Sequence, residues 1–113
     1  MLNGFYSIYY TGKTGTGFGV LVLKDGIVTG ADVSGGIYDG EYTIEDERKV
    51  FEGTIKLVIP PGVPLVTGAG PSQQSYTQQI PISMPFDLNQ GRPVQVQTST
   101  GPVNLIIKKI RNL

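Results

Sequence analysis

The first half of the chain is a succession of short, half-apolar segments separated by glycine-rich breaks. Aromatic and β-branched residues recur at every second position, as in Phe18, Val20 and Val22. A period of two with residues of this type indicates β-strands. The dipeptide Asp25-Gly26 supplies the positive φ values that a two-residue hairpin turn needs. Residues 16–24 and 27–33 are therefore predicted to pair antiparallel, after a first strand at residues 4–11.

Further strands are predicted along the rest of the chain, and one long connection interrupts them. Segments 37–44 and 49–59 continue the meander, and segments 79–86, 94–98 and 103–107 alternate in the same way. The prolines from Pro60 to Pro64 end the fifth strand, because proline lacks the amide donor that a sheet interior needs. Residues 60–74 are predicted to form a loop, and a loop of this length is either functional or a mobile connection.

The predicted fold is a single all-β domain. About eight antiparallel strands in up-and-down order remove their edges most economically by closing into a lipocalin-like barrel. A β-sandwich is the structural alternative, but it calls for Greek-key crossovers, and the early turns are too short for them. The chain has 113 residues, enough to bury one core. We therefore expect one eight-stranded antiparallel β-barrel over residues 1–113.

Charge and hydropathy exclude some partners. The formal net charge is zero, and the dense basic stripe typical of nucleic-acid-binding proteins is missing. Residues 1–56 carry five basic and eight acidic groups, whereas residues 57–113 carry four basic and one acidic, so the two halves are oppositely polarised. No apolar run approaches the length of a membrane span, and the amino terminus lacks the pattern of a signal peptide. We expect a cytoplasmic protein that binds neither nucleic acid nor membrane.

The amino-acid composition removes most catalytic chemistry. The chain has no histidine and no cysteine, so it lacks the commonest general base, the thiolate nucleophile and the nitrogen and sulfur ligands of zinc. Carboxylate pairs such as Asp39 and Glu41 share a strand face, but acidic residues of this kind are nearly always simply solvated. We expect a non-enzymatic protein with no catalytic residue, cofactor or metal.

Asp32 shares a strand face with Val28 and Gly30, which makes it the most informative acidic residue. If that face points inward, the carboxylate must be hydrogen-bonded to a tyrosine hydroxyl or to backbone amides. The tyrosines and aliphatic residues of the first five strands either fill the barrel completely or line an apolar cavity with a few polar groups. The candidate cavity residues are Tyr6, Ile8, Tyr10, Asp32, Tyr38, Tyr42, Phe51 and Ile55.

The segment Glu45-Asp46-Glu47 lies between the fourth and fifth predicted strands. Three like charges at a hairpin tip stay in water, where they either keep the turn soluble or steer a basic partner. Lys108, Lys109 and Arg111 form a small basic patch near the other end of the chain. That patch either complements the acidic turn of a second subunit or simply ends the last strand.

Several spaced motifs carry a family likeness. The series Gly4-Phe5-Tyr6-Ser7-Ile8, Gly17-x-Gly19-Val20-Leu21-Val22-Leu23-Lys24-Asp25-Gly26, Thr29-Gly30-Ala31-Asp32 and Tyr38-Asp39-Gly40-x-Tyr42 resembles the GrlR-like family of negative regulators of type III secretion. The resemblance covers residues 3–58. It implies a lipocalin-like, eight-stranded barrel with an apolar interior, which forms a homodimer and binds a transcriptional activator rather than DNA. In that family an acidic surface motif contacts the activator. The matching residues here are Glu45, Asp46 and Glu47, with Arg48 at the fourth acidic position.

Two functional hypotheses follow from these observations. The first is a cytoplasmic regulator that binds and represses a basic transcriptional activator through Glu45, Asp46 and Glu47. The second is a barrel that binds a lipid-like or aromatic small molecule in its tyrosine-lined interior.

Overall fold

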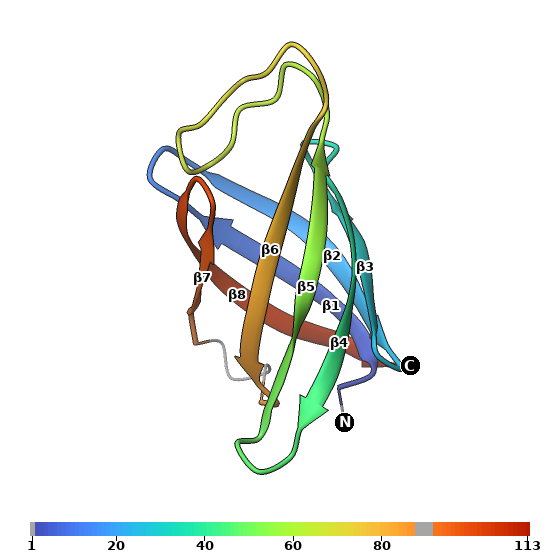
Figure 1. The fold of residues 1–113 in the computed structure, drawn as a ribbon. Coiled ribbons are helices and arrows are strands. Elements are labelled where there is room, and N and C mark those ends of the chain that lie inside the picture. The colour runs from blue at the N-terminus through green and yellow to red at the C-terminus, as the bar shows by residue number, and fades with distance from the viewer. Residues whose placement is uncertain (1, 88–91) are drawn as a thin grey trace.

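A computed structural model describes residues 2–87 and 92–113. In these residues all regular structure is β, and eight strands form one antiparallel sheet that curves into a barrel (Figure 1). The strands are β1 (Gly4–Thr11), β2 (Thr16–Lys24), β3 (Ile27–Asp32), β4 (Ile37–Glu45), β5 (Val50–Ile59), β6 (Tyr76–Pro85), β7 (Val94–Thr98) and β8 (Gly101–Asn112). The prediction of an all-β, eight-stranded antiparallel barrel is confirmed, and the sandwich alternative is not seen.

Hydrogen-bonded neighbours run in the order β6-β5-β4-β3-β2-β1-β8-β7. Strand β1 therefore pairs with both β2 and β8, which brings the two ends of the chain together. The β2–β3 hairpin turns at Asp25 and Gly26, whose φ angles of 49° and 86° are both positive. This is the two-residue turn that the sequence predicts.

The barrel has a seam between β6 and β7, the two strands at the ends of the hydrogen-bonded order. Pro81 and Pro85 both lie on β6. Proline fits a strand only where the missing amide would point away from the neighbouring strand. The prolines of β6 are therefore compatible with the edge that faces the seam. They also protect this edge against pairing with another chain.

The core follows from the strict alternation of side chains along the strands. Apolar residues of all eight strands point inward, and Tyr6, Phe51 and Val28 are among the most deeply buried of them. Residues of the opposite parity, such as Tyr9 on β1 and Ile27 on β3, are exposed on the outer surface. The inward-facing residues of the sheet therefore form a single core.

Inward-facing glycines let the strands bend tightly around this core. A Cβ atom on Gly53 of β5 would lie 1.9 Å from the carbonyl oxygen of Glu41 on β4, and one on Gly30 of β3 would lie 2.1 Å from that of Val20 on β2. No side chain fits in such a space. The glycines are therefore required by the close approach of neighbouring backbones where the sheet curves.

Two strands, β6 and β8, differ from the predicted bounds by more than one residue. Strand β6 begins at Tyr76, three residues before the predicted start at Gln79, so the long loop covers residues 60–75. Strand β8 runs from Gly101 to Asn112 and is longer than the predicted segment 103–107, because β1 pairs with residues 104–112 and β7 pairs with residues 101–105. In the part of the chain that the structure describes, no helix has the length and apolar character that a membrane crossing requires.

Candidate functional site

The barrel interior contains a cavity of about 150 Å³. Seven of the eight residues proposed from the sequence line it: Tyr6, Ile8, Tyr10, Asp32, Tyr38, Phe51 and Ile55. Tyr42 is buried but packs edge-on against the Phe51 ring, with ring centroids 5.5 Å apart, and does not line the cavity. The interior is therefore not completely filled. A cavity of ~150 Å³ in a protein core is large enough to hold a benzene-sized molecule.

Asp32 is the centre of a hydrogen-bond cluster at one end of the cavity. Its Oδ2 atom accepts hydrogen bonds from the Tyr38 hydroxyl at 2.6 Å and the Tyr10 hydroxyl at 3.0 Å. Its Oδ1 atom accepts from the backbone amides of Ser34 at 3.0 Å and Gly36 at 2.9 Å. The predicted hydrogen bonds of Asp32 to tyrosine hydroxyls and backbone amides are thus both present. The cluster joins β1, β3 and β4 at the β3–β4 turn.

The two tyrosines of this cluster are held in their protonated form. Burial, followed by the hydrogen bond to Asp32, raises the pKa of Tyr38 far above its ordinary value. Burial and the negative charge of Asp32 raise the pKa of Tyr10 to about 12. Both phenols therefore remain hydrogen-bond donors to the carboxylate at physiological pH. This end of the cavity carries a negative charge that is fully hydrogen-bonded.

The loop of residues 60–75, here called the lid, covers the same end of the barrel (Figure 1). Residues 63–67 of the lid line the cavity. The amide of Thr14, in the β1–β2 turn, donates to the Val66 carbonyl at 2.8 Å, and the Thr14 hydroxyl donates to the same oxygen at 3.1 Å. The Thr67 hydroxyl donates to the Thr100 hydroxyl in the β7–β8 turn at 3.0 Å. The lid is therefore attached to two turns at this end.

The sequence left open whether this loop is functional or mobile, and it did not indicate that the loop closes the barrel. One feature of the sequence could have indicated this closing role. The apolar residues Val63, Leu65 and Val66 lie inside a proline- and glycine-rich segment. Apolar residues in a loop gain free energy by covering a core rather than by facing water. Here they cover the open end of the cavity.

Gln78 is a further cavity residue that sequence reasoning missed. It lies on the inward face of β6 and is only 4% exposed. Its Nε2 atom donates to the hydroxyls of Ser99 at 2.9 Å and Thr100 at 3.1 Å, in the turn between β7 and β8. This side chain bridges the seam where β6 and β7 share no ladder of hydrogen bonds. Its position in the same alternation as Ile80, Ile82 and Met84 was the signal that could have identified it.

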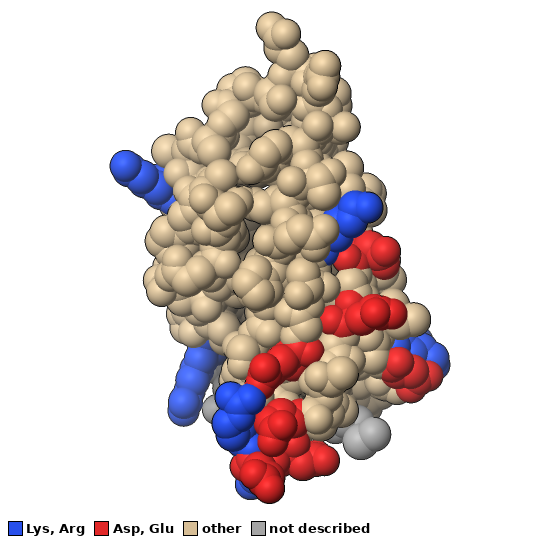
Figure 2. All heavy atoms as spheres, in the orientation of Figure 1, with Lys and Arg blue, Asp and Glu red and all other residues tan. Residues whose placement is uncertain are grey.

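The acidic turn, defined as Glu45, Asp46 and Glu47, lies at the opposite end of the barrel from the lid. Asp46 and Glu47 are exposed between β4 and β5, and Glu45 is half-buried at the end of β4. Figure 2 shows that acidic side chains gather on this end and along the adjacent strands. Arg48 forms a salt bridge with Glu52 on β5 and therefore neutralises that carboxylate rather than those of the acidic turn.

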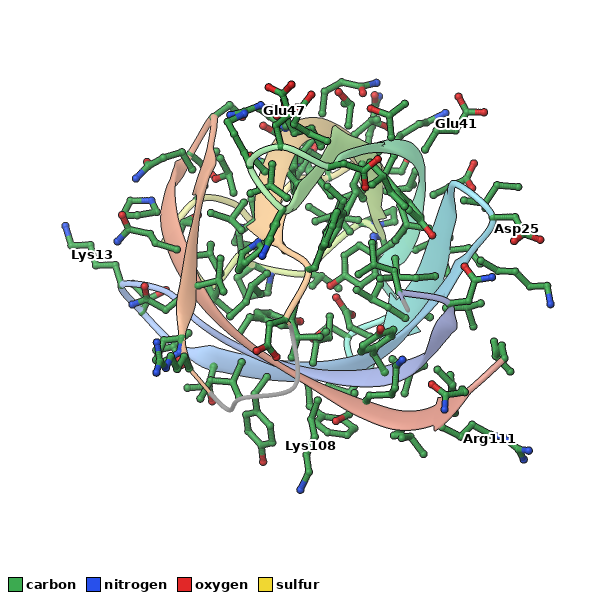
Figure 3. The ribbon with its side chains drawn as sticks, turned by 90° about the horizontal axis from the view of Figure 1, so that it is seen from below. Lys13, Asp25, Glu41, Glu47, Lys108 and Arg111 are labelled. Carbon is green, nitrogen blue, oxygen red and sulfur yellow. The ribbon has the colours of Figure 1, made fainter. Side chains whose placement is uncertain are left out.

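The basic patch lies on the other side of the barrel. Figure 3 shows that Glu47 and Lys108 point outward from opposite sides of the ring of strands. The prediction that the basic patch complements the acidic turn of a second subunit stays a prediction.

Comparison with protein-family models finds no match, and comparison with curated proteins finds none either. The resemblance to the GrlR-like family rests on the spaced motifs of residues 3–58. The chain is, by its fold, an eight-stranded up-and-down barrel with a lidded interior and an acidic turn at the far end.

Proposed function

We propose that this chain is a non-enzymatic, cytoplasmic regulatory protein that binds a basic protein partner, such as a transcriptional activator, through the acidic turn. The exposed position of Asp46 and Glu47 at the tip of the β4–β5 hairpin carries this proposal. Exposed charges at a protruding tip guide a partner of opposite charge and require little desolvation before contact.

The charges around the turn support an electrostatic role. Asp39, Glu41 and Glu52 lie on β4 and β5 and continue the acidic surface beyond the turn. Arg48 is engaged by Glu52, so fewer cations remain to neutralise the turn itself. The β4–β5 hairpin holds six carboxylates against the three cations Arg48, Lys49 and Lys56, so a partner that presents lysine or arginine side chains would meet a net negative surface. Such binding should weaken as salt concentration rises.

The test is an affinity pulldown with the unmodified chain and with the turn variant Glu45→Gln/Asp46→Asn/Glu47→Gln. Bound proteins are identified by mass spectrometry, and binding of each purified candidate is then measured directly. We expect a DNA-binding protein that the unmodified chain retains and the turn variant loses, with at least a tenfold drop in affinity.

The matched control makes the same change in net charge at another place. Gln95→Lys, Gln97→Lys and Asn104→Lys add three positive charges on the exposed faces of β7 and β8. This control variant should keep the partner. If both variants lose the partner equally, or if neither loses it, the acidic turn is not the binding site.

A second candidate function is supported by the cavity. We propose that the barrel interior binds a small apolar molecule beneath the lid. The observation that favours it is the cavity of about 150 Å³, whose lining is apolar apart from a few polar groups at the lid end. This arrangement is typical of small-ligand sites. Replacing Ile80 on β6 with Phe would fill the cavity and should abolish ligand binding while the barrel still folds.

A further inference from the structure

The interior of the barrel has a polar end and an apolar end. At the lid end, the hydroxyls of Tyr10 and Tyr38 meet Asp32, and Gln78 meets Thr100. The opposite end is lined by apolar groups, among them Phe51 and Met84, which are paired in register on β5 and β6. A molecule with one polar group would therefore be oriented with that group toward the lid.

The charge on the cavity lining is negative. Among the lining residues that the structure describes, Asp32 carries the only carboxylate, and none is a lysine or an arginine. Residues 57–86, which include the whole lid, contain no charged residue. Lys109 places its ammonium 5.6 Å from the centre of the Tyr6 ring, but it is not a lining residue, and Tyr6 is only 2% exposed. An anion inside this cavity would therefore have no cationic side chain to pair with.

The hydrogen bonds that Asp32 already accepts also disfavour an anion in the cavity. Its two oxygens already accept four hydrogen bonds from Tyr10, Tyr38, Ser34 and Gly36. The two phenolic protons are committed to Asp32, so the phenolic oxygens are left to act as acceptors. The cluster thus offers acceptors and negative charge to an incoming group. A carboxylate next to this cluster would lose its hydration, meet the like charge of Asp32 and gain no donor from the two phenols.

We propose that the cavity selects neutral or cationic apolar molecules of about the size of one aromatic ring, bound with a hydrogen-bond donor toward Asp32 and the lid, and that it excludes carboxylates. This inference rests on the proposed function of the interior as a ligand site, and it narrows the ligand class. It narrows the expected range of lipid-like or aromatic ligands to neutral and cationic ones, because a fatty-acid headgroup is an anion.

The test uses three probes that share one ring and differ in charge: benzyl alcohol, benzylamine and benzoate. Each is titrated into the unmodified chain at neutral pH and followed by protein NMR. We expect benzyl alcohol and benzylamine to shift the signals of cavity residues, and benzoate to bind at least tenfold more weakly. Equal or tighter binding of benzoate would overturn the selectivity and leave interior binding in place. If none of the three binds, the interior-ligand function is refuted together with the selectivity.

Two variants locate the source of the selectivity. In Asp32→Asn, the preference for benzylamine over benzoate should fall at least fivefold, because the negative charge is removed. The matched control Asp39→Asn removes a carboxylate from the exposed face of β4 and should leave the preference unchanged. An unchanged preference in Asp32→Asn contradicts the proposal. If Asp32→Asn does not fold, the ratio of the three affinities in the unmodified chain still decides the question.

Discussion

The hydroxyl of Tyr38 donates a hydrogen bond of 2.6 Å to the Oδ2 atom of Asp32, which lies across the β3–β4 turn. The same carboxylate accepts from Tyr10 on β1, two strands away. One acidic side chain therefore connects three strands at the lid end. Its removal should affect both the stability of the fold and the polarity of the cavity.

Replacing Tyr38 with Phe should lower the free energy of unfolding by about 1.5–3 kcal/mol, the range for a hydrogen bond to a charged group. Tyr38 is only 9% exposed, so water cannot easily replace the lost donor. The matched control is Tyr9→Phe, because Tyr9 is 57% exposed on the outer face of β1 and should change stability by less than about 0.5 kcal/mol. Urea unfolding of both variants measures the difference. Equal effects would contradict a structural role for the Tyr38–Asp32 bond.

The raised tyrosine pKa values predict a loss of stability at alkaline pH. The pKa of Tyr10 is about 12 in the folded protein, against an ordinary value of 10.0, and that of Tyr38 is also raised. The folded state therefore keeps these protons at pH values where the unfolded chain has lost them. Their contribution is fully present below about pH 10 and is lost as pH rises further, with a slope of at most ~1.4 kcal/mol per pH unit for each tyrosine. Solvent screening makes the contribution of half-buried Tyr10 smaller.

Urea unfolding at a series of pH values between neutral and strongly alkaline checks this expectation. The variant Tyr38→Phe should show a shallower decline, because one of the titrating groups is removed. A free energy of unfolding that stays constant through this range would show that the phenols titrate normally in the folded barrel.

Gly53→Ala should destabilise the barrel by about 1–3 kcal/mol, because the added Cβ would lie 1.9 Å from the carbonyl oxygen of Glu41. Gly15→Ala is the control, since a Cβ there meets nothing within 4 Å. Thermal unfolding of the two variants should therefore differ clearly. If Gly53→Ala is as stable as Gly15→Ala, the strands do not approach as closely as described.

Thr14→Val should loosen the lid without unfolding the barrel. The change removes the hydroxyl that donates to Val66 but keeps the Thr14 amide that donates to the same carbonyl. Loss of one exposed hydrogen bond should speed amide exchange in the lid, at Leu65 and Gly68, by about 2–10-fold. Thr16→Val, on the exposed face of β2, is the control and should leave exchange in the lid unchanged. Equal exchange in both variants would show that this hydroxyl does not hold the lid.

The fold was predictable because its signals are local. The period of two and the Asp25-Gly26 turn determine the strands and the first hairpins directly. The position of the seam was not predictable, because it depends on which distant strands pair. The contact of β1 with β8 joins residues about a hundred positions apart in the chain, and no local pattern encodes it.

The candidate site was predictable in its chemistry and only partly in its arrangement. An inward Asp32 needed donors, and tyrosines were the obvious ones, but sequence could not decide between Tyr10, Tyr38 and the other tyrosines. That choice depends on the register between β1 and β4, which are separated by β2 and β3. The closing role of the lid was missed because it arises from contacts across the barrel end. Gln78 was missed because the predicted strand began at Gln79, one residue too late to include it in the alternation of β6.

The lid and the acidic turn lie at opposite ends of β4, which carries Tyr38 near the one and Glu45 at the other. Seven residue steps at ~3.4 Å each separate these side chains by roughly 24 Å along the strand. A small molecule beneath the lid and a protein on the turn could therefore be bound at the same time without touching. Simultaneous occupancy of the two sites is the expected behaviour of this barrel.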